Sequence, residues 1–318
     1  MANGTFSKED LRTIRSSITM YDRNDIKWAS NFARFGYLDP YNSLDRSREY
    51  LFFTKPDLNI FNDNDDSALN EYTSKIPYFC ELFNNGYKDV LRHLQSSTLS
   101  SKLQGPFMNM LSWAVNSTLD LPTISSNATS TAENIYGTTM QYMSTDFSSD
   151  EKFEFTLDFE DTKFLDIYHI FKAWVEYSRY KSRGVIKPKD TYIFNRILYD
   201  QSSIYKFIVD DTQTIIHYSK VWGVFPMGVA RDTFSSLSND SGVKFSQPFM
   251  GTFVDDMDPL ILRDFNSIVE PYCKGRKDIP TYSKSRGSAN ADLAYMPYIR
   301  KVYSNIDGYY RYKLMWRY

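Results

Sequence analysis

The acidic side chains best placed to act together are Asp255, Asp256 and Asp258, which lie within four residues of one another. Two carboxylates that flank a glycosidic bond can serve as general acid and general base. The same stretch, completed by Pro259, also has the residue types that turns prefer for backbone reasons. We therefore expect a turn before a short helix, with a glycan-binding or glycan-cleaving site as the alternative.

Other chemistry has little support in the sequence. The chain has 3 histidines, His93, His169 and His217, each in a predicted helix or strand where a structural role is more common. Cys80 and Cys273 have no metal-binding spacing, and we expect two separate thiols, with a single long-range disulfide as the alternative. Zinc-protease, Walker, nucleophile-elbow and dinucleotide-binding motifs do not occur. The sequence thus predicts no enzyme, no cofactor and no metal site.

The end of the chain is basic and rich in tyrosine. Lysine and arginine interleaved with aromatic rings can hold phosphates and stack on bases, so a DNA-binding module is a further alternative. Tyrosine, tryptophan and arginine are also the preferred anchors of protein interfaces, which is the interpretation we favour. The predicted interface residues are Tyr303, Tyr309, Tyr310, Tyr312, Trp316, Arg317 and Tyr318.

The clearest pattern of secondary structure in the sequence is a strand followed directly by a helix. Phe153, Phe155, Leu157 and Phe159 alternate with charged or polar residues, which predicts a strand with one buried face. From 164 the apolar residues recur at three and four positions, which predicts an amphipathic helix that Gly184 ends. The polar face of the strand, with Glu154, Asp158 and Glu160, is left for water or a partner.

The next segments predict more strands. Residues 204–209 and 214–224 flank a turn and form a predicted hairpin, and 243–254 form a further strand. We expect an α+β fold, an antiparallel β-sandwich or barrel packed on one long helix. The predicted regions are a helical N-terminal region (1–115), a linker or extended arm (116–139), the barrel (140–266) and an extended C-terminal tail (267–318).

The composition of the chain argues against further classes of function. The chain has 318 residues, 17% of them aromatic, which suits strand packing and large contact surfaces. A net charge of -2 argues against a surface built as a whole to neutralise phosphates. The first ten residues lack the apolar core of a secretory signal, and no run approaches the roughly 18 apolar residues of a membrane span. We expect no membrane partner.

The order of these elements resembles the tail-tube and tube-initiator family of contractile bacteriophages. The resemblance spans about 139–266 and is carried by packing motifs. These are the strand 153–159, Phe171-Lys172-Ala173-Trp174-Val175, Gly184-Val185-Ile186-Lys187-Pro188, the stretch from His217 to Pro226, the strand 243–254 and Phe265-Asn266.

The resemblance implies a structural virion protein of the tail, made in the host cytoplasm. Six copies would close into a ring, and stacked rings would form a tube through which DNA passes without specific binding. Neighbouring tail or baseplate proteins would be partners, and Glu154, Asp158 and Glu160 would face the lumen. The additions on both sides of the barrel favour an adaptor at the baseplate or neck over a repeating tube subunit.

Overall fold

The computed structural model describes residues 47–62, 65–95, 105–122, 125–130, 132, 139, 141–148, 153–162, 164–195, 199–210, 213–229, 244–273, 296–303 and 310–317. The chain divides into a large compact unit, Arg48–Arg300 with Tyr312–Tyr318, and a small one, Met1–Ser47 with Lys301–Arg311. The predicted boundaries at 115, 139 and 266 fall inside the large unit. That division into regions stays a prediction.

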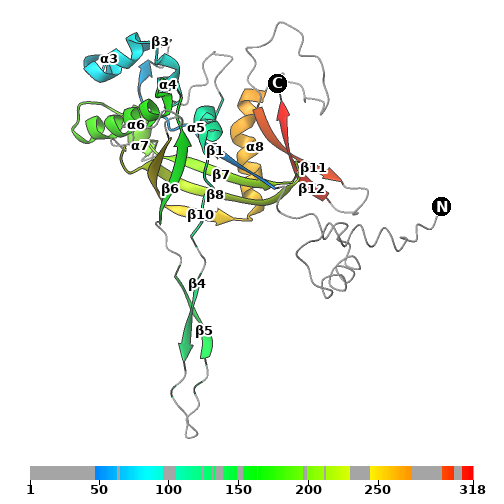
Figure 1. Ribbon diagram of the computed structural model, residues 1–318. Helices are drawn as coiled ribbons and strands as arrows, with labels where there is room; N and C mark the ends of the chain where they lie inside the picture. Colours follow the sequence, from blue (N-terminus) through cyan, green and yellow to red (C-terminus); the bar gives the residue numbers. More distant parts are fainter. Residues whose placement is uncertain are drawn as a thin grey trace, which may run out of the picture. The chain divides into compact units, whose positions relative to one another are not determined.

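Six antiparallel strands form the main sheet of the large unit, in the order β1-β7-β8-β9-β6, with β10 paired to β8 (Figure 1). They are β1 (Arg48–Phe53), β6 (Phe153–Glu160), β7 (Ser202–Val209), β8 (Ile215–Pro226), β9 (Lys244–Gly251) and β10 (Phe253–Asp256). Within the described residues β1 and β6 do not pair with each other, so the sheet is open. The prediction of a closed barrel is wrong; the fold is mixed, with open antiparallel sheets and several helices.

The gap between β1 and β6 is spanned by the segment that contains α5 (Asn109–Ala114). At its start, the N–H of Met108 donates to the carbonyl of Phe53 over 2.8 Å. At its end, the N–H of Asn116 donates to the carbonyl of Asp158 over 2.9 Å. The outer edges of β1 and β6 are thus each partly covered by one connector rather than by each other.

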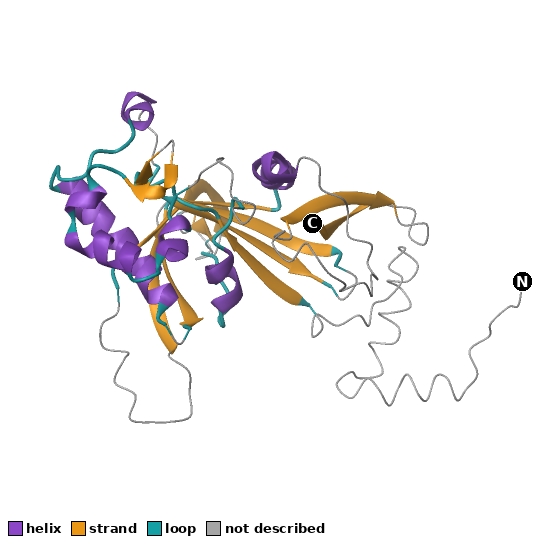
Figure 2. Cartoon of the chain, turned by 90° about the horizontal axis from the view of Figure 1, so that it is seen from above, coloured by secondary structure: helices purple, strands orange, loops and turns teal. Residues whose placement is uncertain are grey.

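Two cores lie on the two faces of the sheet. In Figure 2 the strands run between helices on either side. The first core joins β6 and β9 to α6 (Asp166–Ser182), where the rings of Phe159 and Phe171 are 5.2 Å apart. The second joins Phe52 and Phe207 to α8 (Pro259–Cys273), where the Phe207 and Phe265 rings are 5.0 Å apart. The sheet is therefore covered by helices on both faces, and not by one long helix alone.

Helix α6 begins and ends as its sequence requires. The carboxylate of Asp161 accepts the N–H groups of Ile167 and Tyr168, each over 3.0 Å, which satisfies two donors of the first turn. At the other end Gly184 has a φ of 72°, a conformation that glycine adopts without a side-chain clash. The predicted helix and its glycine stop are confirmed.

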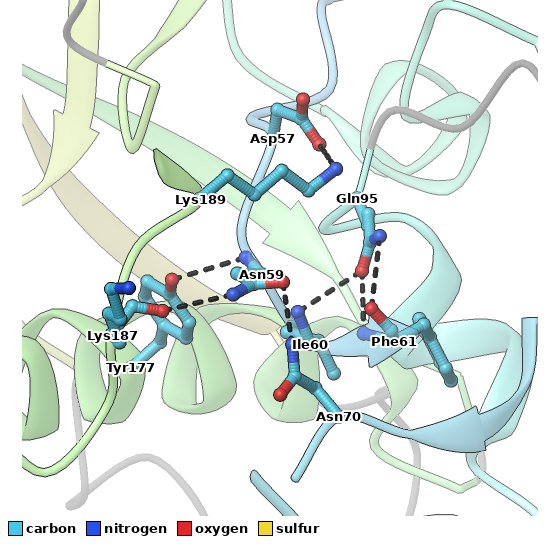
Figure 3. A network of polar contacts seen from close by, with 9 residues as sticks. All are labelled: Asp57, Asn59, Ile60, Phe61, Asn70, Gln95, Tyr177, Lys187 and Lys189. Carbon is cyan, nitrogen blue, oxygen red and sulfur yellow. Dashed lines mark hydrogen bonds and ion pairs between the residues drawn. The ribbon is translucent and has the colours of Figure 1, made fainter. Parts of the chain in front are cut away.

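The region predicted as helical before residue 115 contains strands as well. In its described part the elements besides β1 and α5 are β2 (Phe61–Asn62), β3 (Asp65–Leu69), the 3-10 helix η2 (Thr73–Lys75), α3 (Pro77–Asn84) and α4 (Lys88–Arg92). Figure 3 shows how this region is held to α6 and to the segment after it: the N–H of Asn59 donates to the Tyr177 hydroxyl of α6 over 3.1 Å, and its side-chain amide donates to the Lys187 carbonyl over 2.9 Å. Gln95 accepts the N–H groups of Ile60 and Phe61.

Two further hairpins complete the described elements, together with α7 (Asp190–Asn195). β4 (Ser125–Ser130) and β5 (Gln141–Ser148) pair only with each other in the described residues and leave the main sheet as a separate ladder (Figure 1). β11 (Met296–Tyr303) and β12 (Tyr310–Arg317) form the other hairpin. The described residues of the predicted extended tail (267–318) thus form the end of α8 and a hairpin, and Met296, Ile299 and Leu314 are buried in the second core.

Candidate functional site

The polar face of β6 is the surface that the sequence singled out for function. Glu154, Asp158 and Glu160 are all exposed, while Phe155, Leu157 and Phe159 between them are buried. The predicted alternation is confirmed. The carboxylates lie on one face of the strand, on the side away from the first core.

The paired strand β9 extends this face. Glu154 is opposite Met250, Asp158 is opposite Ser246 and Glu160 is opposite Lys244. The Ser246 hydroxyl donates to the Asp158 carboxylate, and the Asn116 side chain donates to Glu160 over 2.9 Å. These contacts hold the two carboxylates at the surface. The β6–β9 face, which we define as residues 153–160 and 244–251, carries more acid than base.

A second polar group joins β8 to α8. Lys220 has a side chain only 2% exposed, and its Nζ lies 2.5 Å from the carboxylate of Asp264. The Tyr205 hydroxyl donates to the same carboxylate, and the Lys220 Nζ lies 4.8 Å from the Tyr205 ring centroid. Burial lowers the pKa of Lys220, whereas Asp264 acts in the opposite direction. Burial also raises the pKa of Tyr205 above its usual value, with Asp264 adding to the effect. This group holds α8 on the sheet.

A third polar group holds the connector after α5. The Lys206 Nζ donates to the Leu119 carbonyl over 2.6 Å, and Glu49 accepts the N–H of Leu119 over 2.9 Å. Lys206 Nζ and the Glu49 carboxylate are 3.4 Å apart and belong to the paired strands β7 and β1, where Lys206 is opposite Leu51 and so diagonal to Glu49. Sequence reasoning did not predict this group, because a lysine in a strand is usually a solvent-facing residue.

The three carboxylates proposed for glycan chemistry each have a structural partner. Asp255 accepts the Trp222 indole N–H over 2.6 Å, and Asp256 lies 2.8 Å from Nε2 of His217. Asp258 accepts the N–H of Leu260 over 2.9 Å at the start of α8. These contacts support the interpretation as a turn before a helix, which is longer than the short helix expected.

The other two histidines also lie in packed surroundings. His93 caps α4, and burial, reinforced by Lys55, lowers the pKa of His93 to about 4. His169 lies in α6 with its ring 4.6 Å from that of Tyr87, and burial lowers the pKa of His169. In both cases burial favours the neutral form of the imidazole.

The predicted interface residues fall into three groups. Tyr303 and Tyr310 are 51% and 62% exposed, and their rings are 5.1 Å apart. Tyr312 and Trp316 instead pack partly against the second core of the same chain. Tyr309 and Tyr318 lie outside the described residues, and for Arg317 the structure gives only its place at the end of β12. The interface role stays a prediction.

A shallow cavity of about 370 Å³ lies between α6 and the end of β8. Trp174, Asp200 and Met227 are among its lining residues. Asp200 already pairs with Lys181, and no cluster of three metal-binding side chains occurs in the part of the chain that the structure describes. None of the helices in the described ranges is long and apolar enough to span a membrane.

Comparison with known proteins gives no match to a family model or to a curated protein sequence. Among solved structures, the tube-terminating cap of the anti-feeding prophage is 12% identical, with 42% of this chain and 74% of that chain covered and a TM-score of 0.25. The sheath/tube terminator of the extracellular contractile injection system PVC, in the extended state, is 16% identical, with 45% and 85% covered and a TM-score of 0.27. The PVC sheath-tube complex is 14% identical, with 42% and 75% covered and a TM-score of 0.25.

Proposed function

We propose that this chain is a structural subunit of a contractile bacteriophage tail that assembles into a ring around the DNA channel. It would be a tube-like subunit, or an adaptor where the tube meets the baseplate or the neck. Its place is the virion, and its partners are copies of itself, six by family resemblance, and neighbouring tail proteins. DNA passes through the ring without specific binding.

The observation that carries this proposal is that the β6–β9 strand pair has one buried side and one exposed, acidic side. Elsewhere β7 and β8 contribute buried side chains to both cores. The β6–β9 ribbon has one apolar face in the first core and one exposed face that bears Glu154, Asp158 and Glu160. An acidic surface repels phosphate, which suits the wall of a channel that DNA must leave freely.

Two polar groups in the described residues hold elements of the fold together. This supports a structural role for the protein. The Lys220 and Asp264 pair secures α8, and Lys206 with Glu49 secures the connector after α5. The DNA-binding alternative fits less well, because the exposed face of β6 is acidic and the chain's net charge is -2.

The lumen assignment is tested by reversing the charge of the β6–β9 face. Particles that carry Glu154→Lys with Asp158→Lys should assemble and eject DNA more slowly, because cations on the wall would hold phosphates. The control is Glu71→Lys with Asp89→Lys, which reverses two carboxylates that are 75% and 83% exposed in the region before α5. Ejection at the normal rate in the first variant would refute the lumen assignment.

A further inference from the structure

Beside the β6–β9 face, the open edge of β10 combines apolar and acidic side chains. β10 pairs with β8 alone in the described residues, so its other edge has no strand partner there. Phe253 is 49% exposed, Met257 47% and Leu260, in the first turn of α8, 65%. An open strand edge lined by exposed apolar side chains is typical of a surface that another chain covers. We call residues 253–260 the β10 edge.

The charge of the β10 edge indicates what kind of partner it fits. Residues 253–260 contain three acidic residues and no lysine or arginine. Asp256 is exposed at the end of β10 beside the exposed Met257. A complementary partner would present aromatic rings together with cations, since such rings bury apolar area and the cations match the carboxylates.

The tip of the β11–β12 hairpin has this chemistry. Tyr303 and Tyr310 are exposed and pack edge to face, and the Lys301 Nζ lies 4.6 Å from the Tyr310 ring centroid. Arg311 is also exposed. Residues 296–317 contain five basic residues and one acidic residue. We define Lys301, Tyr303, Tyr310 and Arg311 as the hairpin tip.

We infer that the hairpin tip of one copy docks on the β10 edge of a second copy of this chain. The two surfaces differ and are complementary in charge, so the contact is heterologous. Each copy binds one neighbour through its hairpin tip and the other neighbour through its β10 edge. Contacts of this kind close into rings when the rotation between copies allows it. This inference rests on the proposed function, since it names the surfaces that join the ring.

The direct test is a site-specific photo-crosslink from the full chain. A benzoylphenylalanine at Phe253, in a mixture of isotopically light and heavy protein, should give mixed-mass crosslinks to the peptide that contains Tyr303 or Tyr310. The matched control places the same probe at Phe194, which is 83% exposed on α7, and should not label that peptide. Crosslinks from Phe253 that map to another surface, or to its own copy only, overturn the inference.

Charge reversal supplies a second, independent measurement. Lys301→Glu with Arg311→Glu should raise the protein concentration needed for assembly roughly tenfold or more, because the three acidic residues of the β10 edge would then face two new carboxylates. Arg183→Glu with Lys187→Glu makes the same charge change at two exposed residues after α6 and should leave that concentration unchanged.

Electron microscopy of the same samples distinguishes a failure of the docking inference from a failure of the proposed function. Rings with a crosslink elsewhere, or rings that form equally well in the Lys301→Glu and Arg311→Glu variant, reject this docking surface and leave the proposed function standing. Absence of any ring from the unmodified chain rejects both.

Discussion

The buried pair Lys220 and Asp264 allows an asymmetric prediction for stability. Lys220 is 2% exposed, so its ammonium group depends on Asp264 for charge neutralisation. The Asp264 side chain is 36% exposed and reaches water without Lys220. Removal of one partner from a fully buried ion pair costs about 3–5 kcal/mol. Removing the carboxylate should therefore cost much more than removing the amine.

The expected magnitudes follow from what each variant leaves behind. Asp264→Leu leaves the Lys220 ammonium buried and the Tyr205 hydroxyl without its acceptor, for a loss of about 3 kcal/mol in the free energy of unfolding. Lys220→Met leaves a carboxylate that water can solvate, for a loss of about 1 kcal/mol. In the double variant no charge is buried alone, so it should be more stable than Asp264→Leu, because a well-packed apolar pair can replace a buried ion pair.

Urea unfolding of the wild type and these three variants, followed by tryptophan fluorescence and circular dichroism, measures the four free energies. Linear extrapolation of each curve gives the double-mutant cycle. Equal losses in the two single variants, or a double variant at least as unstable as Asp264→Leu, would show that the pair is not buried as described.

Two further predictions concern the packing around His93 and Gly251. Because the pKa of His93 is about 4 in the folded chain and near 6.5 when unfolded, the unfolded chain binds more protons between these values, and stability should fall by about 3 kcal/mol as the pH drops from 6.5 to 4. Urea unfolding at pH 7 and pH 4.5 should show that His93→Gln loses less free energy of unfolding between these two pH values than the wild type does. An equal loss in the two proteins would exclude His93 as the source of the pH dependence. A Cβ at Gly251 would lie 2.8 Å from the Phe153 ring and 3.0 Å from Val221, so Gly251→Ala should cost about 1–3 kcal/mol. The control Gly228→Ala, with nothing within 4 Å of its new Cβ, should be nearly neutral, and similar melting temperatures for the two variants would contradict the described packing.

Periodicity predicted the elements that have one buried face. β6 alternates buried and exposed residues along its whole length, and α6 buries one stripe between Ile167 and Tyr177. Both patterns are visible in the sequence because water on one side imposes a polar residue at each outward position.

Hydrophobic periodicity did not predict β1, because both faces of this strand are covered. Leu51 and Phe53 point into the first core, while Phe52 between them points into the second. Three consecutive buried residues give no alternation, and a short apolar run is compatible with a helix or a strand. The open sheet was missed for a related reason, since the connector at Met108 and Asn116 makes contacts that no local pattern records.

The polar pairs were beyond sequence reasoning as well. Lys220 lies 44 residues from Asp264, and Lys206 lies 87 residues from Leu119. Only the packing of α8 and of the connector on the sheet brings these groups together. The Asp258 turn was predictable, because its hydrogen bond to Leu260 is local.

Whether this chain builds a ring can be measured by electron microscopy of the purified protein over a concentration series, paired with its sedimentation mass. We expect rings with an open centre, or short stacks of them, with a mass that is a multiple of 37.2 kDa. A single species of 37.2 kDa at every concentration, with no ring in any image, would contradict this expectation.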